Sequence, residues 1–242
     1  MIRTLLLIAV TSFVLAVGSL TAAVAIVGGP FWIDENGQVH KGDWHGGRQW
    51  RHDESQPDTQ RQIPWSGGHR LYIDVPADVT YIQGLKPQLT LSGPADLLGR
   101  IEVHDGEITA RGFDFDDARL KITLTAPEVN RFQVNGDGSL TIAAYDQTEL
   151  DLDISGSAKV TAAGRAKQAD LHISGSGDVD FSALKLDAAK VDVSGSGDAT
   201  LAPESEARID ISGSGDVRLL KTPKSEKVDI SGAGRVDEPH GG

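Results

Sequence analysis

The sequence predicts an all-β protein built as a parallel β-helix, or β-solenoid, with about 19 residues in each coil. The first observation behind this prediction is a repeat. A short motif, Asp-Ile/Val-Ser-Gly-Ser-Gly-Asp in its fullest form, recurs through the C-terminal half, with its first serine at positions 155, 174, 194, 212 and 231. These positions are 19, 20, 18 and 19 residues apart, and Asn135 lies 20 residues before the first of them. A fixed period near this length is typical of stacked supersecondary units.

The second observation is an apolar–polar–apolar alternation just before each serine, which is typical of a strand with one buried face. The inner column, three residues before the serine, contains Phe132, Leu152, Leu171, Val191, Ile209 and Val228, and the column one residue before it contains Val134, Ile154, Ile173, Val193, Ile211 and Ile230. The polar position between them holds Gln133, Asp153, His172, Asp192, Asp210 and Asp229.

The third observation is a second short alternating strand after each glycine pair, as in Val160 and Ala162 or Val179 and Phe181. The period leaves no room for a crossover helix of ordinary length. Each coil must therefore consist of short strands that pair in parallel with the next coil, about 4.8 Å away. At the corners, we expect the glycines to permit positive φ and a close approach of neighbouring coils, and the serines to bond freed backbone groups. The corner glycines are Gly175, Gly177, Gly195, Gly197, Gly213 and Gly215.

The amino-acid composition and net charge exclude several classes of function. The 242 residues are 39% apolar and only 5% aromatic, with 28 glycines, no cysteine and a formal net charge of −12. The lack of cysteine excludes disulfides, thiolate metal sites and cysteine nucleophiles. The acidic excess lies after residue 70. Such a body repels phosphate backbones, so the sequence predicts no nucleic-acid partner.

The N-terminus predicts export. Residues 5–27 contain no charged side chain and are long enough to cross a hydrocarbon core. Residues 1–27 are therefore either a transmembrane anchor or a signal peptide, the latter ending in the cleavage pattern Ala23-Val24-Ala25. Residues 28–69, with all four tryptophans and no helix or strand period, predict a flexible linker. Both alternatives place the rest of the chain on the periplasmic or cell-surface side of a bacterial membrane.

The repeated Asp-Ile/Val-Ser-Gly-Ser-Gly-Asp coils behind an exported N-terminus resemble the GIN-domain family of auto-transporter adhesin heads, domains of the bacterial envelope. The resemblance covers residues 70–236 and includes the upstream segments that begin at Leu89, Ile101 and Leu120, which we expect to form less regular opening coils. Residues 237–242 form a tail. The resemblance implies a β-solenoid in the cell envelope. Nothing after Val236 has the pattern of an outer-membrane barrel, unlike a complete autotransporter.

The sequence favours a non-catalytic binding or structural module that resembles an adhesin head, with an envelope protein or glycan as partner. It predicts no catalytic residue, no cofactor and no bound metal, and a monomer or at most a weak end-to-end dimer. The alternative is a polysaccharide-processing β-helix enzyme. Its candidate residues would be the acids Asp114, Asp116 and Asp117, or His172 beside Ser155, Ser174 and the column aspartates.

A calcium site is a further alternative, because three carboxylates follow successive glycine corners. Asp178, Asp198 and Asp216 recur one coil apart, as in Ca²⁺-binding β-helix repeats. The period here is about twice that of those repeats, so a solvated acidic ladder remains the favoured interpretation.

Overall fold

The structure is a computed structural model that describes residues 31–33, 39–41, 58–111 and 119–239. The chain divides into two units, residues 1–52 and 53–242. In the first unit, strands β1 (Phe31–Ile33) and β2 (Val39–Lys41) pair antiparallel within the stretch interpreted as linker. The segment 1–27 lies outside the described residues. No helix among the residues that are described is long and apolar enough to span a membrane.

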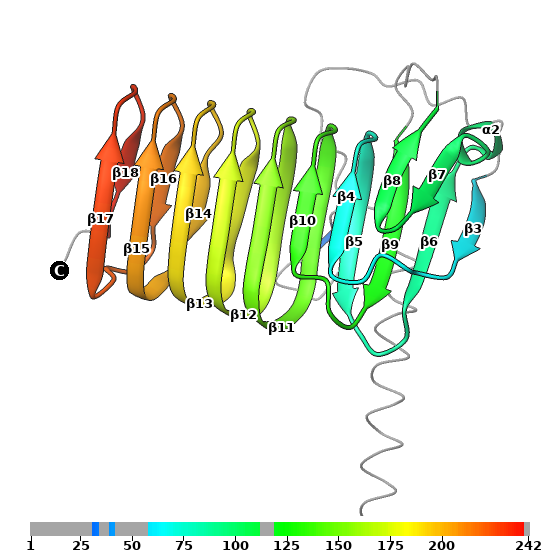
Figure 1. The fold of residues 1–242 in the computed structure, drawn as a ribbon, viewed down its shortest axis with the longest axis horizontal. Helices are drawn as coiled ribbons and strands as arrows, with labels where there is room; N and C mark the ends of the chain where they lie inside the picture. Colours follow the sequence, from blue (N-terminus) through cyan, green and yellow to red (C-terminus); the bar gives the residue numbers. More distant parts are fainter. Residues whose placement is uncertain (1–30, 34–38, 42–57, 112–118, 240–242) are drawn as a thin grey trace, which may run out of the picture. The chain divides into compact units, whose positions relative to one another are not determined.

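The C-terminal part of the second unit is a stack of parallel coils (Figure 1). Leu152 pairs in register with Leu171, Leu171 with Val191, Val191 with Ile209, and Ile209 with Val228. The alternation that the sequence predicts is therefore confirmed as an all-β solenoid of about five turns. Its strands are β10 (Arg131–Val134), β11 (Gly138–Ile154), β12 (Ala158–Ile173), β13 (Asp178–Val193), β14 (Ala199–Leu201), β15 (Pro203–Ile211), β16 (Asp216–Leu219), β17 (Ser225–Ile230) and β18 (Arg235–Asp237).

Each coil has two faces joined by a serine–glycine corner. Face 1 consists of the residues that precede the corners, namely 131–134, 151–154, 170–173, 190–193, 208–211 and 227–230. Face 2 consists of the residues that follow them, such as 138–142, 158–161 and 216–219. Strands β11, β12 and β13 run through both faces, with a register shift where β11 and β12 bend. Each coil therefore presents one row of alternate side chains inward and the other row to solvent.

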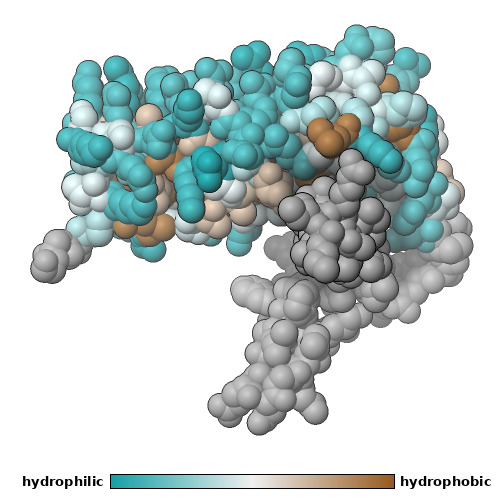
Figure 2. Space-filling model, turned by 90° about the horizontal axis from the view of Figure 1, so that it is seen from below, coloured by the Kyte–Doolittle hydropathy of each residue, from teal (hydrophilic) through white to brown (hydrophobic). Residues whose placement is uncertain are grey.

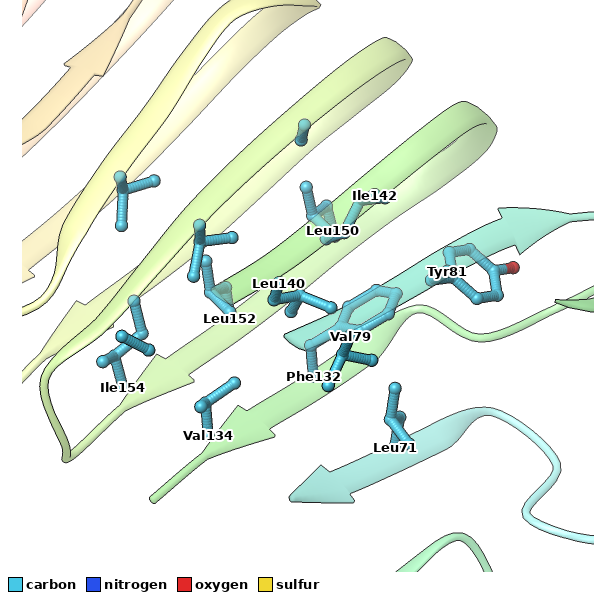
Figure 3. Packing of buried hydrophobic residues seen from close by; sticks show 14 of the residues in the cluster. Leu71, Val79, Tyr81, Phe132, Val134, Leu140, Ile142, Leu150, Leu152 and Ile154 are labelled. Carbon is cyan, nitrogen blue, oxygen red and sulfur yellow. The ribbon is translucent and has the colours of Figure 1, made fainter. Parts of the chain in front are cut away.

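The inward side chains form one core between the two faces (Figure 3). Both predicted columns are buried from Phe132 to Ile211, with at most 5% of any side chain exposed. The core is aromatic at its N-terminal end, where the rings of Tyr81 and Phe132 lie edge to face with centroids 5.2 Å apart. Beyond Tyr145 the coils pack mainly aliphatic residues. In the last coil, Val228 and Ile230 are 40% and 41% exposed because no further described coil covers them.

The opening coils are not stacked in sequence order. Strand β4 (Arg70–Ile73) lies between β8 (Glu107–Ala110) and β10, all in parallel. Strand β5 (Ala77–Gln83) likewise lies between β9 (Leu120–Ala126) and β11. The chain therefore leaves the stack after β5, forms an outer coil with β8 and β9, and returns to continue at β10.

Antiparallel strands and a short helix cover the N-terminal end of this stack (Figure 1). Strand β6 (Gln88–Gly93) pairs antiparallel with β9, β3 (Thr59–Ile63) with β6, and β7 (Ile101–His104) with β8. Helix α2 (Ala95–Leu98) buries Leu97 and Leu98 against the core. Strand β3 and the core-contacting Trp65 belong to the stretch interpreted as linker, so this part of the chain is folded.

The corners confirm one of the two roles expected for glycine and contradict the other. Among the described residues, the glycines with positive φ are Gly68, Gly106, Gly138 and Gly164, and none belongs to a Ser-Gly-Ser-Gly corner. The expectation of positive φ at the corners was wrong. A Cβ atom on Gly195 would lie only 1.9 Å from the carbonyl oxygen of Gly175, and one on Gly213 equally close to that of Gly195. Glycine is required there because successive corners touch through their backbones.

Candidate functional site

The outward side chains of face 1 form two straight ladders across the coils. Because the coils pair in register, equivalent residues lie side by side. Ladder A, four residues before each corner serine, contains Arg131, Asp151, Asp170, Lys190, Arg208 and Lys227. Ladder B, two residues before it, contains Gln133, Asp153, His172, Asp192, Asp210 and Asp229. Face 1 is thus an ordered array of both charge signs.

Ion pairs organise this array. The Nε atom of Arg131 lies 3.0 Å from Oδ2 of Asp151, which joins two neighbouring coils. Two coils further on, Nζ of Lys190 lies 2.6 Å from Oδ2 of Asp192 on its own strand. The hydrogen bond to Asp192 raises the pKa of Lys190 above its usual value. Each of these pairs is about half exposed, so it contributes little stability and is weakened by salt.

A depression of about 360 Å³ opens between these pairs, over β10, β11, β12 and β13. Ladder residues from Arg131 to Lys190 and from Gln133 to Asp192 surround it, and Phe132, Leu152 and Leu171 also contribute to its lining. Within it, Oδ1 of Asp170 is buried and has no hydrogen-bond partner. A buried carboxylate oxygen without a donor is costly, so this atom marks a point where a donor from a partner would be favourable.

The residues proposed for an enzyme do not assemble into catalytic geometry. Ser155 donates a hydrogen bond to Oδ1 of Asn135 and Ser174 to the carbonyl oxygen of Ile154, so both serines bond corner atoms. His172 is exposed between Asp153 and Asp192 of ladder B, and no described serine is hydrogen-bonded to it. The acids Asp114, Asp116 and Asp117 lie outside the described residues.

Two of the three aspartates proposed for calcium, Asp198 and Asp216, bond the backbone of the next coil. Oδ1 of Asp198 accepts a hydrogen bond from the backbone N–H of Asp216 at 2.8 Å, and Oδ1 of Asp216 accepts one from that of Arg235 at 3.2 Å. Arg235 also lies 2.6 Å from the other oxygen of Asp216. No group of three His, Asp or Glu side chains that could hold a metal ion occurs among the described residues. These carboxylates connect one corner to the next.

Face 1 is therefore the best candidate site, and the sequence indicated it only in part. The alternation identified ladder B as outward. Ladder A carries the basic residues of the ion pairs. It could have been found in the sequence, because the residue four positions before each serine is charged and its sign changes along the stack. Figure 2 shows a different side of the solenoid, where hydrophilic residues predominate and hydrophobic ones form only small patches. Large exposed apolar side chains among the described residues are confined to Leu85, Leu220, Val228 and Ile230.

The fold and this face define a β-solenoid with an ordered, charged surface. The family described as "putative auto-transporter adhesin, head GIN domain" matches residues 70–223. The chain belongs to this family, as its repeated motif indicates. No protein with a curated description matches the chain in sequence.

Several solved structures resemble this chain to different degrees. A putative adhesin from Bacteroides fragilis is 20% identical, with a TM-score of 0.60 over 76% of this chain and 98% of that one. A putative lipid binding protein from Parabacteroides distasonis is 16% identical, with a TM-score of 0.44 over 77% and 98% of the two chains. A putative adhesin from Parabacteroides merdae is 15% identical, with a TM-score of 0.43 over 77% and 98%. The first of these likenesses supports the solenoid fold.

Proposed function

We propose that this protein is a non-catalytic, adhesin-like binding module of a bacterial cell envelope, and that it binds its partner through face 1. The apolar segment 5–27 holds it at a membrane or directs its export, and the solenoid lies on the periplasmic or cell-surface side. Membership of an adhesin-head family supports an envelope location. The single observation that carries the binding role is the depression between ladders A and B.

The chemistry of face 1 favours a protein segment over a neutral glycan as the partner. The lining offers carboxylates, two basic groups, an amide and an imidazole, arranged in rows with both charge signs. A peptide with both charge signs can satisfy such rows, including the unpaired Oδ1 of Asp170, whose partner would be an N–H donor. Because none of the exposed large apolar residues lines the depression, we expect a polar, hydrated interface whose affinity falls with salt.

A pair of charge reversals in the same fold tests this proposal. Lys190→Glu changes the depression and leaves Asp192 without its partner. Lys159→Glu changes the net charge by the same amount, but Lys159 lies on face 2 in the ladder of Asp178. Immobilised wild-type protein and both variants would be incubated with envelope fractions, and bound proteins quantified. We expect Lys190→Glu to lower recovery of the partner about tenfold, and Lys159→Glu to leave it unchanged.

Two results would contradict the proposal. Equal loss of partner in both variants would show that net charge, and not face 1, determines binding. Release of new reducing ends from envelope polysaccharide by the wild-type protein would favour the enzyme alternative instead.

A further inference from the structure

The last coil of the stack differs from the coils before it in how its charges are used. The pattern basic–apolar–Asp occurs in Lys190-Val191-Asp192, Arg208-Ile209-Asp210 and Lys227-Val228-Asp229. In the first two, the basic side chain is ion-paired with the aspartate of its own strand, at 2.6 and 3.3 Å. In the last, neither Lys227 nor Asp229 has an ion pair with another described residue. The charges of Lys227 and Asp229 are therefore available to a partner.

Among the described residues, the backbone of β17 is paired on one side only, with β15. The N–H of Ser231 donates to the carbonyl oxygen of Ile211 on β15, at 2.8 Å. Since successive backbone groups of a strand alternate in direction, those of Val228 and Ile230 point to the open side. Their side chains, which continue the core columns, are 40% and 41% exposed. An edge strand with unpaired backbone groups and exposed apolar side chains pairs readily with another strand.

We propose that this edge binds a second copy of the same chain, with β17 pairing antiparallel with the partner's β17. A two-fold axis between two identical edges brings them together antiparallel and makes the interface self-complementary. The inward residue Val228 must lie opposite another inward residue, so only every second register is possible.

Charge selects one register among these. With Val228 opposite the partner's Val228, each Lys227 lies opposite an Asp229 of the other copy, and two ion pairs form across the axis. Shifting the register by two residues in one direction places each Lys227 opposite the partner's Lys227. Shifting it by two residues in the other direction places each Asp229 opposite the partner's Asp229. Like charges directly opposite each other are destabilising.

Strand β18 has the same sequence pattern on face 2, although its Arg235 is already ion-paired with Asp216 and Asp237. Its sequence Arg235-Val236-Asp237 is again basic–apolar–Asp, and it pairs with β16 on one side only. An antiparallel approach centred on Val236 brings Arg235 opposite Asp237. Glu226, the third inward residue of β17, would lie opposite the partner's Ile230, and its charge keeps the association weak.

Single cysteines test the register, because the chain has no cysteine of its own. Directly opposed residues in the proposed pair have Cα atoms about 5.5 Å apart, within reach of a disulfide, whereas diagonal neighbours are about 7–8 Å apart. In the full-length chain in non-ionic detergent, mild oxidation should crosslink Val228→Cys. It should crosslink Lys227→Cys and Asp229→Cys far less, and Leu85→Cys, which is 92% exposed at another site, not at all.

Exchanging the charges of Lys227 and Asp229 tests the same contact, because an exposed cysteine alone would crosslink regardless of these charges. In the Val228→Cys background, Lys227→Asp should lower the crosslinked fraction about tenfold, because both symmetry-related pairs become repulsive. Adding Asp229→Lys should restore it. A Lys227→Asp chain mixed with an Asp229→Lys chain should give heterodimers and few homodimers, detected by two different tags.

Circular dichroism of each variant controls for folding. The proposal is overturned if Val228→Cys crosslinks no better than Leu85→Cys, or if a cysteine at 227 or 229 crosslinks best. It is also overturned if the double exchange fails to restore crosslinking in a folded protein. These outcomes do not bear on the depression over β10 to β13, which contains none of the substituted residues and whose partner binding is measured separately.

Discussion

The two ends of this solenoid solve the same problem in different ways. At the N-terminal end, α2 and the antiparallel strands β3, β6 and β7 cover the stack, and the core beneath them is aromatic. At the C-terminal end of the described chain, β17 and β18 leave Val228 and Ile230 partly exposed, and charged residues flank them along the strand. Repeat proteins generally need terminal units with polar outer faces. Here one end has a built cap, and the other has an ordinary coil whose edge is charged.

This comparison teaches that position in the stack, more than residue type, determines how much a core residue contributes. Phe132, Ile209 and Val228 occupy the same column, yet the first two are fully buried and the third is 40% exposed. We therefore expect mutational effects to decline from the capped interior to the open edge.

The largest effect is expected where a charge is placed in the fully buried core of the regular coils. Ile211→Asp should lower the free energy of unfolding by at least ~5 kcal/mol, because it removes a buried side chain and buries a carboxylate without a partner. Asp210→Lys, one residue away, faces solvent and should change it by less than about 1 kcal/mol. Urea unfolding followed by circular dichroism measures both. Equal damage from the two variants would contradict the inward–outward alternation.

An intermediate effect sharpens the contrast along one column. Phe132→Ala should cost about 3–5 kcal/mol, because its ring is buried against Tyr81 and lies near Tyr145. Val228→Ala in the same column should cost less than about 1 kcal/mol, because the side chain is already partly in water. The same unfolding measurement applies, at a protein concentration that keeps the chain monomeric. A large loss from Val228→Ala would show that the open edge is covered.

The smallest effect concerns a charge at the open edge. Burial, and next Glu238, raise the pKa of Glu226, so its ionisation is harder in the folded chain than in the unfolded one. Glu226 therefore has no effect on the free energy of unfolding at pH values below its pKa in the unfolded chain. Once the pH exceeds its pKa in the folded chain, its ionised carboxylate lowers the free energy of unfolding. Glu226→Gln should stabilise the protein at pH 7 by less than about 0.5 kcal/mol and have no effect near pH 3. A gain at pH 3 equal to that at pH 7 would contradict an electrostatic cause.

The regular coils could be predicted from the sequence because each feature recurs at a fixed period. Six equivalent positions, from Phe132 to Val228, show the same alternation, and this redundancy identifies the inward face without any other information. The opening coils offer no such redundancy. That β5 lies between β9 and β11 depends on long-range pairing, and β3 has polar residues at four of its five positions, so neither was visible in the local pattern.

The candidate site could be predicted only to the level of its ladders. Periodicity shows that residues such as Asp153 and His172 face outward. It cannot show that Lys190 bonds Asp192 while Arg131 bonds Asp151 of the next coil, since this depends on side-chain conformation. The corner glycines illustrate the same limit. The sequence indicates that glycine is needed, but only the three-dimensional structure shows that the backbones of Gly175 and Gly195 are in contact.

The in-register pairing of the coils has a mechanical consequence. Each regular coil bonds only the coil before it and the coil after it, so a pulling force applied at the C-terminal end would detach one coil at a time. The depression on face 1 lies over β10 to β13, on the side of the capped end. If tension runs from a partner held there to the N-terminal segment, it bypasses β14 to β18 altogether. Those coils would then remain unloaded while the contact with that partner is under strain.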